Sequence, residues 1–251
     1  DLLKNSLTNA DIVIPLASLV GAPLCSKDPY TAKAVNHDAI MMMLNLLSKN
    51  QLIIMPTTNS AYGTGDENNF CTEDSHLRPI SQYAIEKVEI EKELLEHENA
   101  ISFRLATVFG MSPKMRIDLL VNDFTYRAFY DRFIVLFEAH FKRNYIHVCD
   151  VARAIEFCIK HFNKLKGNIF NIGLESANLT KLELCKLIKK NHKSFKIKIN
   201  EFDKDPDQRD YIVSNQKILS TGWRPKFSLE KGIKELIKCY KSLKINRESN
   251  I

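Results

Sequence analysis

The sequence lacks the features that mark several common classes of protein. Its six cysteines include no CxxC motif and no paired spacing, so a disulfide framework is not expected. No apolar stretch is long enough to span a membrane, and the first residues lack the basic-then-apolar order of a signal peptide. We therefore expect a cytoplasmic protein whose cysteines are reduced and lie in its core.

Charge of one sign is not concentrated anywhere either. The formal net charge is +6 and 26% of the 251 residues are charged, but the lysines are spread over polar faces. This dispersion predicts a solvated surface that favours anionic substrates rather than a nucleic-acid interface. Hydrophobic residues make up 45% of the chain, which is enough for one large domain or one domain with a small lobe.

Apolar runs alternate with helical periodicity in the first half of the chain. We expect strands at 11–17, 52–58 and 100–110, helices at 30–49 and 79–95, and a loop at 59–69. Strands separated by helices of this length predict a parallel α/β sheet with right-handed crossovers. Ligands of such sheets bind at the carboxyl ends of the strands, where Thr58 and Thr107 are placed.

The second half of the chain is less regular. We expect helices at 117–129, 148–162, 180–191 and 228–243, and strands at 132–141 and 168–173. The apolar stripe of the last helix, with Ile233, Leu236, Ile237 and Tyr240, predicts a face packed on the core. The Met41–Met43 run is also interpreted as core packing. His147 lies in a predicted strand, YIHV, and is interpreted as a structural histidine.

Tyr83 and Lys87 are four residues apart in the stretch PISQYAIEKVEIEKELL (79–95), so one helical face carries both. Taken alone, such a pair is common on solvated helices. A phenol has a pKa near 10 and must become more acidic to act as a base near neutrality. A lysine ammonium one turn away favours the phenolate, and the neighbouring hydroxyl-rich stretch PTTNSAYG offers a group to orient a substrate.

Five stretches in order carry a resemblance to a known family. TTNSAYG, YAIEK, RLATVFG, RNYIHVCDVA and FNIG resemble the extended short-chain dehydrogenases/reductases, the NAD-dependent epimerase/dehydratase family. The resemblance implies a Rossmann-like doubly wound parallel sheet with a small C-terminal α/β substrate lobe. It assigns residues 1–115 to the remainder of an NAD-binding domain and 116–251 mainly to the substrate lobe, with 144–173 returning to the sheet.

The resemblance also implies roles for individual residues. Its catalytic positions match Thr58, Tyr83 and Lys87. Its cofactor-binding positions match Leu16, Ala17, Asn36, Tyr83, Lys87 and Thr107, and its substrate-binding positions match Asn59, Ser60, Asn122, Arg143 and Arg209. It implies NAD as cofactor, no metal, a nucleotide-diphosphate sugar as substrate and a homodimer. Without the resemblance, each of these residues has an ordinary structural interpretation, such as a surface ion pair for either arginine.

Within the family, further stretches resemble a bacterial group that oxidises C4 of a GDP-heptose in capsule biosynthesis. They are PLASLVGAPLC, TNSAYGTG, CTEDSHLRPIS, RLATVFGMSPKMRIDLLVNDFTYRA and DPDQRDYIVSN. Two alternatives stay open: a 4-epimerase, which begins with the same oxidation, and a non-catalytic binding protein that retains the scaffold. In the related 4,6-dehydratases, the two positions that correspond to Asn59 and Ser60 are occupied by Asp and Glu. Because Asn59 cannot titrate and an unassisted serine is a poor base, we expect oxidation without loss of water.

The glycine-rich turn of the family is missing from the sequence. The family begins with a strand and a GxxGxxG turn that holds the cofactor pyrophosphate at a helix N-terminus. None of the eight glycines makes that pattern. We therefore expect that about two βα units of the family fold are not in this sequence and that the 251 residues are a fragment, since the sheet would otherwise have an unpaired edge.

Overall fold

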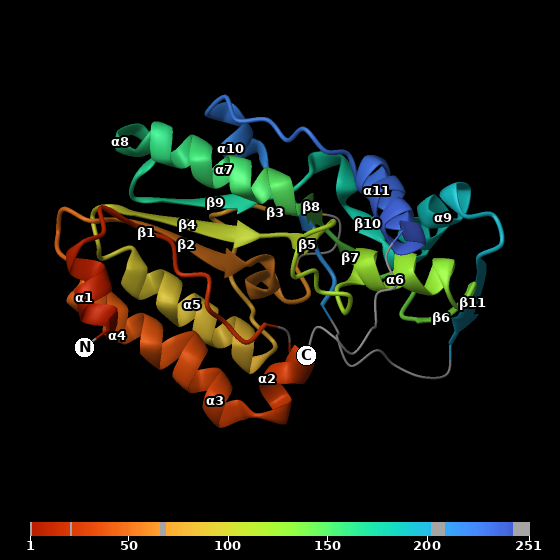
Figure 1. Cartoon of the computed structure of the whole chain (residues 1–251), viewed down its shortest axis with the longest axis horizontal. Coiled ribbons are helices and arrows are strands. Elements are labelled where there is room, and N and C mark those ends of the chain that lie inside the picture. The colour runs from red at the N-terminus through yellow and green to blue at the C-terminus, as the bar shows by residue number, and fades with distance from the viewer. Residues whose placement is uncertain (1, 21, 66–68, 202–208, 243–251) are drawn as a thin grey trace.

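The structure is a computed structural model that describes every residue except 1, 21, 66–68, 202–208 and 243–251. A four-stranded parallel sheet forms the centre of its larger end (Figure 1). Its strands, in spatial order, are β1 (Ile12–Val13), β2 (Leu52–Thr58), β4 (Ala100–Leu105) and β9 (Asn168–Ile172). The predicted α/β Rossmann-like fold with a parallel sheet is confirmed.

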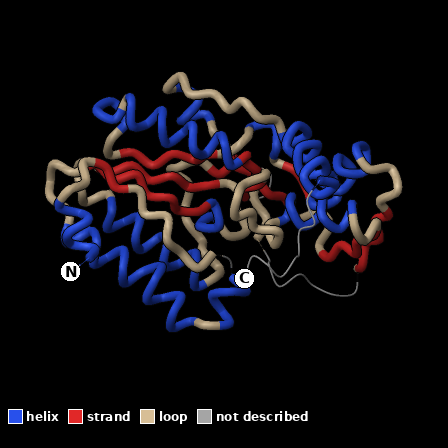
Figure 2. Tube along the Cα trace, viewed as in Figure 1, coloured by secondary structure: helices blue, strands red, loops and turns tan. Residues whose placement is uncertain are grey.

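Helices cover both faces of this sheet (Figures 1 and 2). One face is covered by α1 (Leu2–Thr8), α4 (Ala39–Leu46) and α5 (Gln82–Leu94), and the other by α7 (Val148–Lys160) and α8 (Phe162–Leu165). Strand β2 contributes side chains to the hydrophobic clusters on both faces of the sheet, because successive side chains of a strand point to opposite faces. Ile53 and Met55 join the hydrophobic cluster under α4 and α5, whereas Ile54 joins the larger cluster on the other face.

The helix predicted at 30–49 is not uniform. It consists of α3 (Pro29–Lys33), a π-helical turn η1 (Ala34–Asp38) and α4. The interpretation of the Met41–Met43 run as core is wrong for Met42, which is 51% exposed, while Met43 is buried. Consecutive residues of a helix point about 100° apart, so three methionines in a row cannot all face the same core.

The strand predicted at 100–110 divides into two. Strand β4 ends at Leu105, and β5 (Thr107–Phe109) pairs in parallel with β8 (Tyr145–His147) instead of with β9. The transfer occurs over one residue: the Ala106 amide donates to the Ile172 carbonyl, and the Thr107 amide donates to the Asn144 carbonyl. The chain thus passes from the large sheet into a second, two-stranded sheet.

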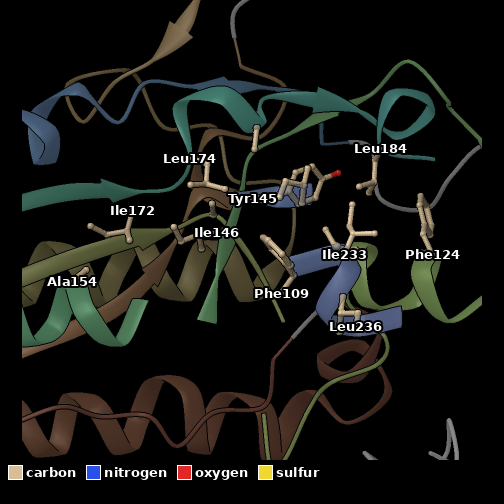
Figure 3. Close-up of a cluster of buried hydrophobic side chains, with 14 of the residues drawn as sticks. Phe109, Phe124, Tyr145, Ile146, Ala154, Ile172, Leu174, Leu184, Ile233 and Leu236 are labelled. Atoms are coloured by element: carbon tan, nitrogen blue, oxygen red, sulfur yellow. The ribbon is translucent and has the colours of Figure 1, made fainter. Parts of the chain in front are cut away.

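The smaller end of the molecule is built from α6 (Leu120–Phe129), α9 (Lys181–Asn191) and α11 (Leu229–Ser242) with the parallel pair β6 (Phe133–Phe137) and β11 (Lys196–Asn200). The predicted core face of the last helix is confirmed. Ile233, Leu236 and Tyr240 are buried, and Ile237 packs against the same cluster. Figure 3 shows Ile233 and Leu236 in this cluster, which also includes Phe109.

The remaining elements are short. They are α2 (Ala22–Lys27), η2 (Asn59–Tyr62), β3 (Phe70–Cys71), β7 (Lys142–Arg143), η3 (Glu175–Ala177), β10 (Leu179–Thr180), β12 (Ile212–Val213) and α10 (Gln216–Ser220). β12 pairs with β3, and β10 pairs with β7. None of the helices in the described ranges combines the length and the apolar character needed to cross a bilayer.

Two residue-level predictions have different outcomes. All six cysteines are free, but Cys149 is exposed in the first turn of α7, so its assignment to the core is wrong. His147 is fully buried, as expected of a structural histidine. Its Nδ1 accepts a hydrogen bond from the Cys149 amide at 3.2 Å, which caps α7, and its ring stacks on Phe227 with 4.3 Å between centroids.

Candidate functional site

The carboxyl end of β2 presents the hydroxyl that the motif predicts. Thr58 is the last residue of β2 and the N-cap of η2: its Oγ1 accepts from the Ser60 amide at 3.1 Å and donates to the Ser60 hydroxyl at 3.0 Å. The turn ends at Gly63, whose φ of +63° is in the left-handed region, and a Cβ there would lie 1.9 Å from the Arg78 carbonyl oxygen. The sequence therefore fixes a tight turn directly after Thr58.

Helix α5 brings Tyr83 and Lys87 to the same part of the molecule. It begins after Ser81, whose Oγ accepts from the Ala84 amide at 3.3 Å, and it packs against both β2 and η2. The Lys87 Nζ lies 5.9 Å from the centroid of the Tyr83 ring. The structure thus brings together the helix of the predicted Tyr/Lys pair and the strand end of the predicted hydroxyl.

Burial controls the protonation of this pair. Burial lowers the pKa of Lys87 to about 8, against the opposing effect of Glu86 and Cys25. Burial also raises the pKa of Tyr83 to about 12, with a further increase from Cys25. The net shift therefore does not make the phenol more acidic in this structure, because loss of hydration outweighs the nearby positive charge.

Two arginines oppose the effect of burial on Tyr83. The guanidinium groups of Arg116 and Arg209 both lower the phenol pKa, although by less than burial raises it. Arg116 was not among the residues predicted from the sequence. It lies before α6 and forms an ion pair with Asp118, and no spacing relates it to Tyr83 along the chain.

A cleft of about 230 Å³ opens beside Tyr83. Its lining includes Cys25, Ser26, Pro29, Gln82, Tyr83 and Glu86. The Cys25 thiol donates to the Leu19 carbonyl at 3.3 Å, and burial raises its pKa. The interpretation of Cys25 as a buried, reduced cysteine agrees with this position, but the sequence did not predict that it lies beside the Tyr83 helix.

Asn36 belongs to the π-helical turn and holds the segment that follows β1. Its Oδ1 accepts from the Leu19 amide and from the Ser18 hydroxyl, each at 2.8 Å, and its Nδ2 donates to the Leu19 carbonyl at 2.8 Å. Upstream on the same segment, Leu16 is 70% exposed and Ala17 is also exposed. Asn36 thus fixes the backbone next to the two residues predicted to contact a cofactor.

The two arginines predicted to bind phosphate meet at one place. Arg143 is fully buried and donates to the Lys142 carbonyl at 2.8 Å and to the Arg209 carbonyl. Its guanidinium carbon lies 5.6 Å from the centroid of the Tyr211 ring. Arg209 donates to the Ser60 hydroxyl, so the segment after residue 208 reaches the turn that follows Thr58.

The remaining predicted site residues differ in how their polar atoms are used. Asn122 is buried, accepts from the Gly110 amide at 3.1 Å and donates to the Arg116 carbonyl at 2.7 Å. Asn59 is buried too, but neither polar atom of its side chain has a hydrogen-bond partner in the described part of the chain. Thr107 is half-buried at the start of β5. Both polar side-chain atoms of Asn122 are therefore bonded within the protein, whereas Asn59 has unused hydrogen-bonding capacity.

A buried polar cluster behind Tyr83 and Lys87 was missed from the sequence. Glu91 accepts from Arg104 Nη2 at 2.6 Å and Nε at 3.0 Å, and from the hydroxyls of Ser102 at 2.6 Å and Thr57 at 3.2 Å. Arg104 Nη1 also donates to the Tyr62 hydroxyl at 3.0 Å. We call these five residues the Glu91 cluster. The spacing of four that relates residues 83 and 87 also reaches 91, which was the available signal.

Metal-binding side chains are not grouped at this site. Within the described ranges, no three or more His, Cys, Asp or Glu side chains lie close enough to hold a metal ion.

The fold and the Tyr83 helix agree with what a family comparison finds. A model of the NAD dependent epimerase/dehydratase family matches residues 1–173, which is more than half of the chain. The chain therefore belongs to this family, and the family prediction made from the motifs is confirmed.

Particular relatives and structures are similar at a lower level. An uncharacterised protein of Schizosaccharomyces pombe is 27% identical over 220 residues, which is 73% of this chain and 60% of that protein. The dTDP-glucose 4,6-dehydratase of Bacillus anthracis in complex with NAD has a TM-score of 0.81 at 20% identity, covering 97% of this chain and 77% of the other. The UDP-glucose 4-epimerase of Thermotoga maritima with UDP-glucose gives 0.81 at 23%, covering 96% and 81%. These two structures share the fold.

Proposed function

We propose that this chain carries the catalytic residues of an NAD-dependent enzyme that oxidises C4 of a nucleotide-diphosphate sugar. The observation that carries the proposal is the placement of Tyr83 and Lys87 on the helix that packs against the Thr58 strand end. The chain spans 60% of the length of its Schizosaccharomyces pombe relative, so the activity proposed is that of the whole protein.

Each of the three residues has a distinct task in this proposal. The Tyr83 phenolate takes the proton of the C4 hydroxyl, and Thr58 Oγ1 holds the oxygen of the same hydroxyl. Because burial raises the pKa of Tyr83 to about 12, the phenolate needs nearby positive charge. Lys87, Arg116 and Arg209 provide that charge, and bound NAD⁺ supplies the hydride acceptor.

The residues fit one half of the cofactor. The exposed Leu16 and Ala17 follow β1 at the carboxyl edge of the sheet, where the Asn36 bonds fix the backbone. Together with Tyr83, Lys87 and Thr107, they would hold the nicotinamide and its ribose. The pyrophosphate half has no GxxGxxG turn to meet it within these 251 residues.

The proposed substrate is a nucleotide-diphosphate sugar, and from the motif resemblance a GDP-heptose of bacterial surface-polysaccharide synthesis. Arg143 and Arg209 would contact its diphosphate, because a guanidinium fork suits paired oxygens. The two similar structures are a dTDP-glucose 4,6-dehydratase and a UDP-glucose 4-epimerase. Sugars linked to dTDP and UDP should therefore be tested as substrates beside those linked to GDP.

Asn59 supports oxidation without loss of water. Elimination needs a group that can give or take a proton at each reacting carbon. Asn59 has no titratable proton, yet its buried amide has unused donors and an acceptor that a sugar hydroxyl can satisfy. Ser60 is bonded to both Thr58 and Arg209. The proposed product is therefore a 4-keto sugar that keeps its C6 hydroxyl.

Quaternary structure and location are also proposals. We propose a cytoplasmic homodimer formed through the helices around α4 and α5. Three apolar side chains on α3 and α4 support it, since Tyr30 is 90% exposed and Met42 and Leu46 are exposed as well. Light scattering that gives a monomer mass at micromolar concentration would overturn the dimer.

The experiment is a screen of GDP-, UDP- and dTDP-sugars with NAD⁺, read by NADH formation and product mass, with Tyr83→Phe as the inactive control. A loss of two hydrogens identifies a dehydrogenase. An unchanged mass with altered NMR couplings identifies a 4-epimerase. A product lighter by one water overturns the role given to Asn59, and no turnover of any nucleotide sugar overturns the proposed function.

A further inference from the structure

The Glu91 cluster joins the two elements that carry Tyr83 and Thr58. Glu91 lies one turn after Lys87 and two turns after Tyr83, so it continues their face of α5. Its partner Thr57 directly precedes Thr58, and Tyr62 is the last residue of the η2 turn that Thr58 caps. One connected set of hydrogen bonds therefore spans the helix, the end of β2 and the turn.

The cluster is buried, and its side chains bond to one another and to neighbouring protein groups. Glu91 is 4% exposed and Arg104 is 3% exposed. Arg104 uses Nε and Nη2 on Glu91, and Nη1 on the Tyr62 hydroxyl and the Glu73 carbonyl. The Tyr62 hydroxyl in turn approaches Asn171 Oδ1 at 2.7 Å, which extends the set to β9.

Stability is a weak reason for such an arrangement. Removing two charges from water is costly, and apolar side chains of similar volume often replace a buried ion pair without loss of stability. A buried pair does, however, fix one arrangement of its elements, because any sliding of α5 along β4 would leave a charge without its partner. Bidentate contact between a guanidinium and a carboxylate is especially demanding of geometry.

We propose that Glu91, Arg104 and Tyr62 are positioning residues that set the Tyr83 phenol relative to the Thr58 hydroxyl. The inference rests on the proposed function for the identity of the two reacting groups. The three residues touch no substrate in this proposal; they act through the elements that they connect.

Two variants and one control test the inference in the whole protein. Tyr62→Phe removes a single hydroxyl from the cluster, and Glu91→Gln removes the charge while keeping the shape. Glu93→Gln makes the same change at an exposed position of α5 and is the matched control. Tyr62→Phe is included because it keeps the ion pair and so folds even if Glu91→Gln does not.

The expected result is a fall in kcat of about 10- to 100-fold per folded molecule, the size expected for a small misplacement of reacting groups. We expect KM to change by less than about twofold, because the substrate contacts remain. The acid limb of the kcat–pH profile should move to higher pH as the phenol moves away from the positive charges around it. Wild-type kcat and pH profile in both variants, with only a lower melting temperature, would overturn the inference.

A readout without turnover separates this inference from the proposed function. In ¹³C-tyrosine NMR, the Tyr83 resonance is identified by its loss in Tyr83→Phe. We expect it to shift in Tyr62→Phe and Glu91→Gln and to stay in place in Glu93→Gln. This result in a protein that turns over no nucleotide sugar would overturn the proposed function alone. An unmoved resonance in both cluster variants would overturn the positioning role, whatever the activity.

Discussion

Two buried asparagines, one in each of two regions near the site, are used in opposite ways. Asn36, in the π-helical turn under the segment after β1, has its amide bonded to Ser18 and Leu19. Asn59, in the turn after β2, has neither polar atom bonded in the described chain, although it is 1% exposed. A buried amide without partners costs free energy, and a protein tolerates that cost where something else can supply the partners.

The same division extends to the charged groups. In the supporting region, Arg104 and Glu91 are buried as a bonded pair. In the reacting region, burial changes the pKa values of Lys87 and Tyr83 in the direction that removes their charge. The comparison teaches that Asn36, Glu91 and Arg104 are satisfied by hydrogen bonds within the protein, whereas burial disfavours the charged forms of Lys87 and Tyr83. Four predictions, which use six substitutions, can break or sharpen this division.

The largest effect is expected for Tyr83→Phe. Removing the proposed base should lower kcat by roughly 10²–10⁴, the range for general acid–base catalysis. The free energy of unfolding should barely change, because the phenol hydroxyl makes no hydrogen bond within the described part of the chain. Steady-state kinetics and urea unfolding of the same preparation measure both. A fully active variant would move the base to another residue.

Arg104→Gln should produce the next largest effect, this time on stability. Breaking a buried pair leaves the Glu91 carboxylate uncompensated and typically costs about 3–5 kcal/mol. Arg116→Gln breaks the solvent-facing pair with Asp118 and should cost less than about 1 kcal/mol. Urea unfolding of both variants measures the two losses of unfolding free energy. Equal losses would show that the buried Glu91 carboxylate is not stabilised by Arg104.

Lys87→Met should stabilise the fold while it removes activity. Burial lowers the pKa of Lys87 from 10.5 to about 8, a cost of about 3 kcal/mol at neutral pH. Below pH 8 the wild type bears this full cost. Between pH 8 and 10.5 the folded state has lost the proton that the unfolded state still binds, so wild-type stability rises relative to the variant.

The measurement for Lys87→Met is the difference in unfolding free energy between variant and wild type from pH 7 to pH 10. We expect the difference to be largest at pH 7 and to shrink as the pH rises. A difference that stays constant across this range would contradict titration of Lys87 in the folded protein.

The smallest effects separate the two asparagines directly. Asn36→Ala leaves the Leu19 amide and carbonyl without their partner and should cost about 1–3 kcal/mol. Asn59→Ala removes an unbonded amide and should change stability by less than about 0.5 kcal/mol, while it raises KM for the sugar. Thermal unfolding of the two variants measures both changes in stability. A larger loss of stability for Asn59→Ala than for Asn36→Ala would contradict the difference proposed between the two asparagines.

Local patterns predicted much of the architecture. The continuous apolar run 52–58 became β2 with the same bounds, and the stripe of α11 faces the core as expected. Strand β11 was not predicted, because its Lys/Ile alternation lies largely exposed and only its pairing with β6 makes it a strand. The division between β4 and β5 likewise depends on a change of partner strand.

The motifs placed Tyr83, Lys87 and Thr58, but not the groups that surround them. Glu91 and Arg104 are 13 residues apart and meet only because α5 packs on β4. The direction of the pKa shift of Tyr83 also escaped prediction, since burial is a property of the folded chain while a spacing of four shows only the neighbouring lysine.

The π-helical turn Ala34–Asp38 rotates the buried face of α4 relative to that of α3, although the three elements follow one another without a break. A π turn contains one residue more than an α turn, so the faces of α3 and α4 are out of register with each other by about 100°. Ala32 on α3 can therefore be buried at the α2 side while Ile40 and Met43 on α4 are buried on the sheet. Deleting one residue of the π-helical turn would make residues 29–46 a regular α-helix. Only one of α3 and α4 could then keep its present neighbours.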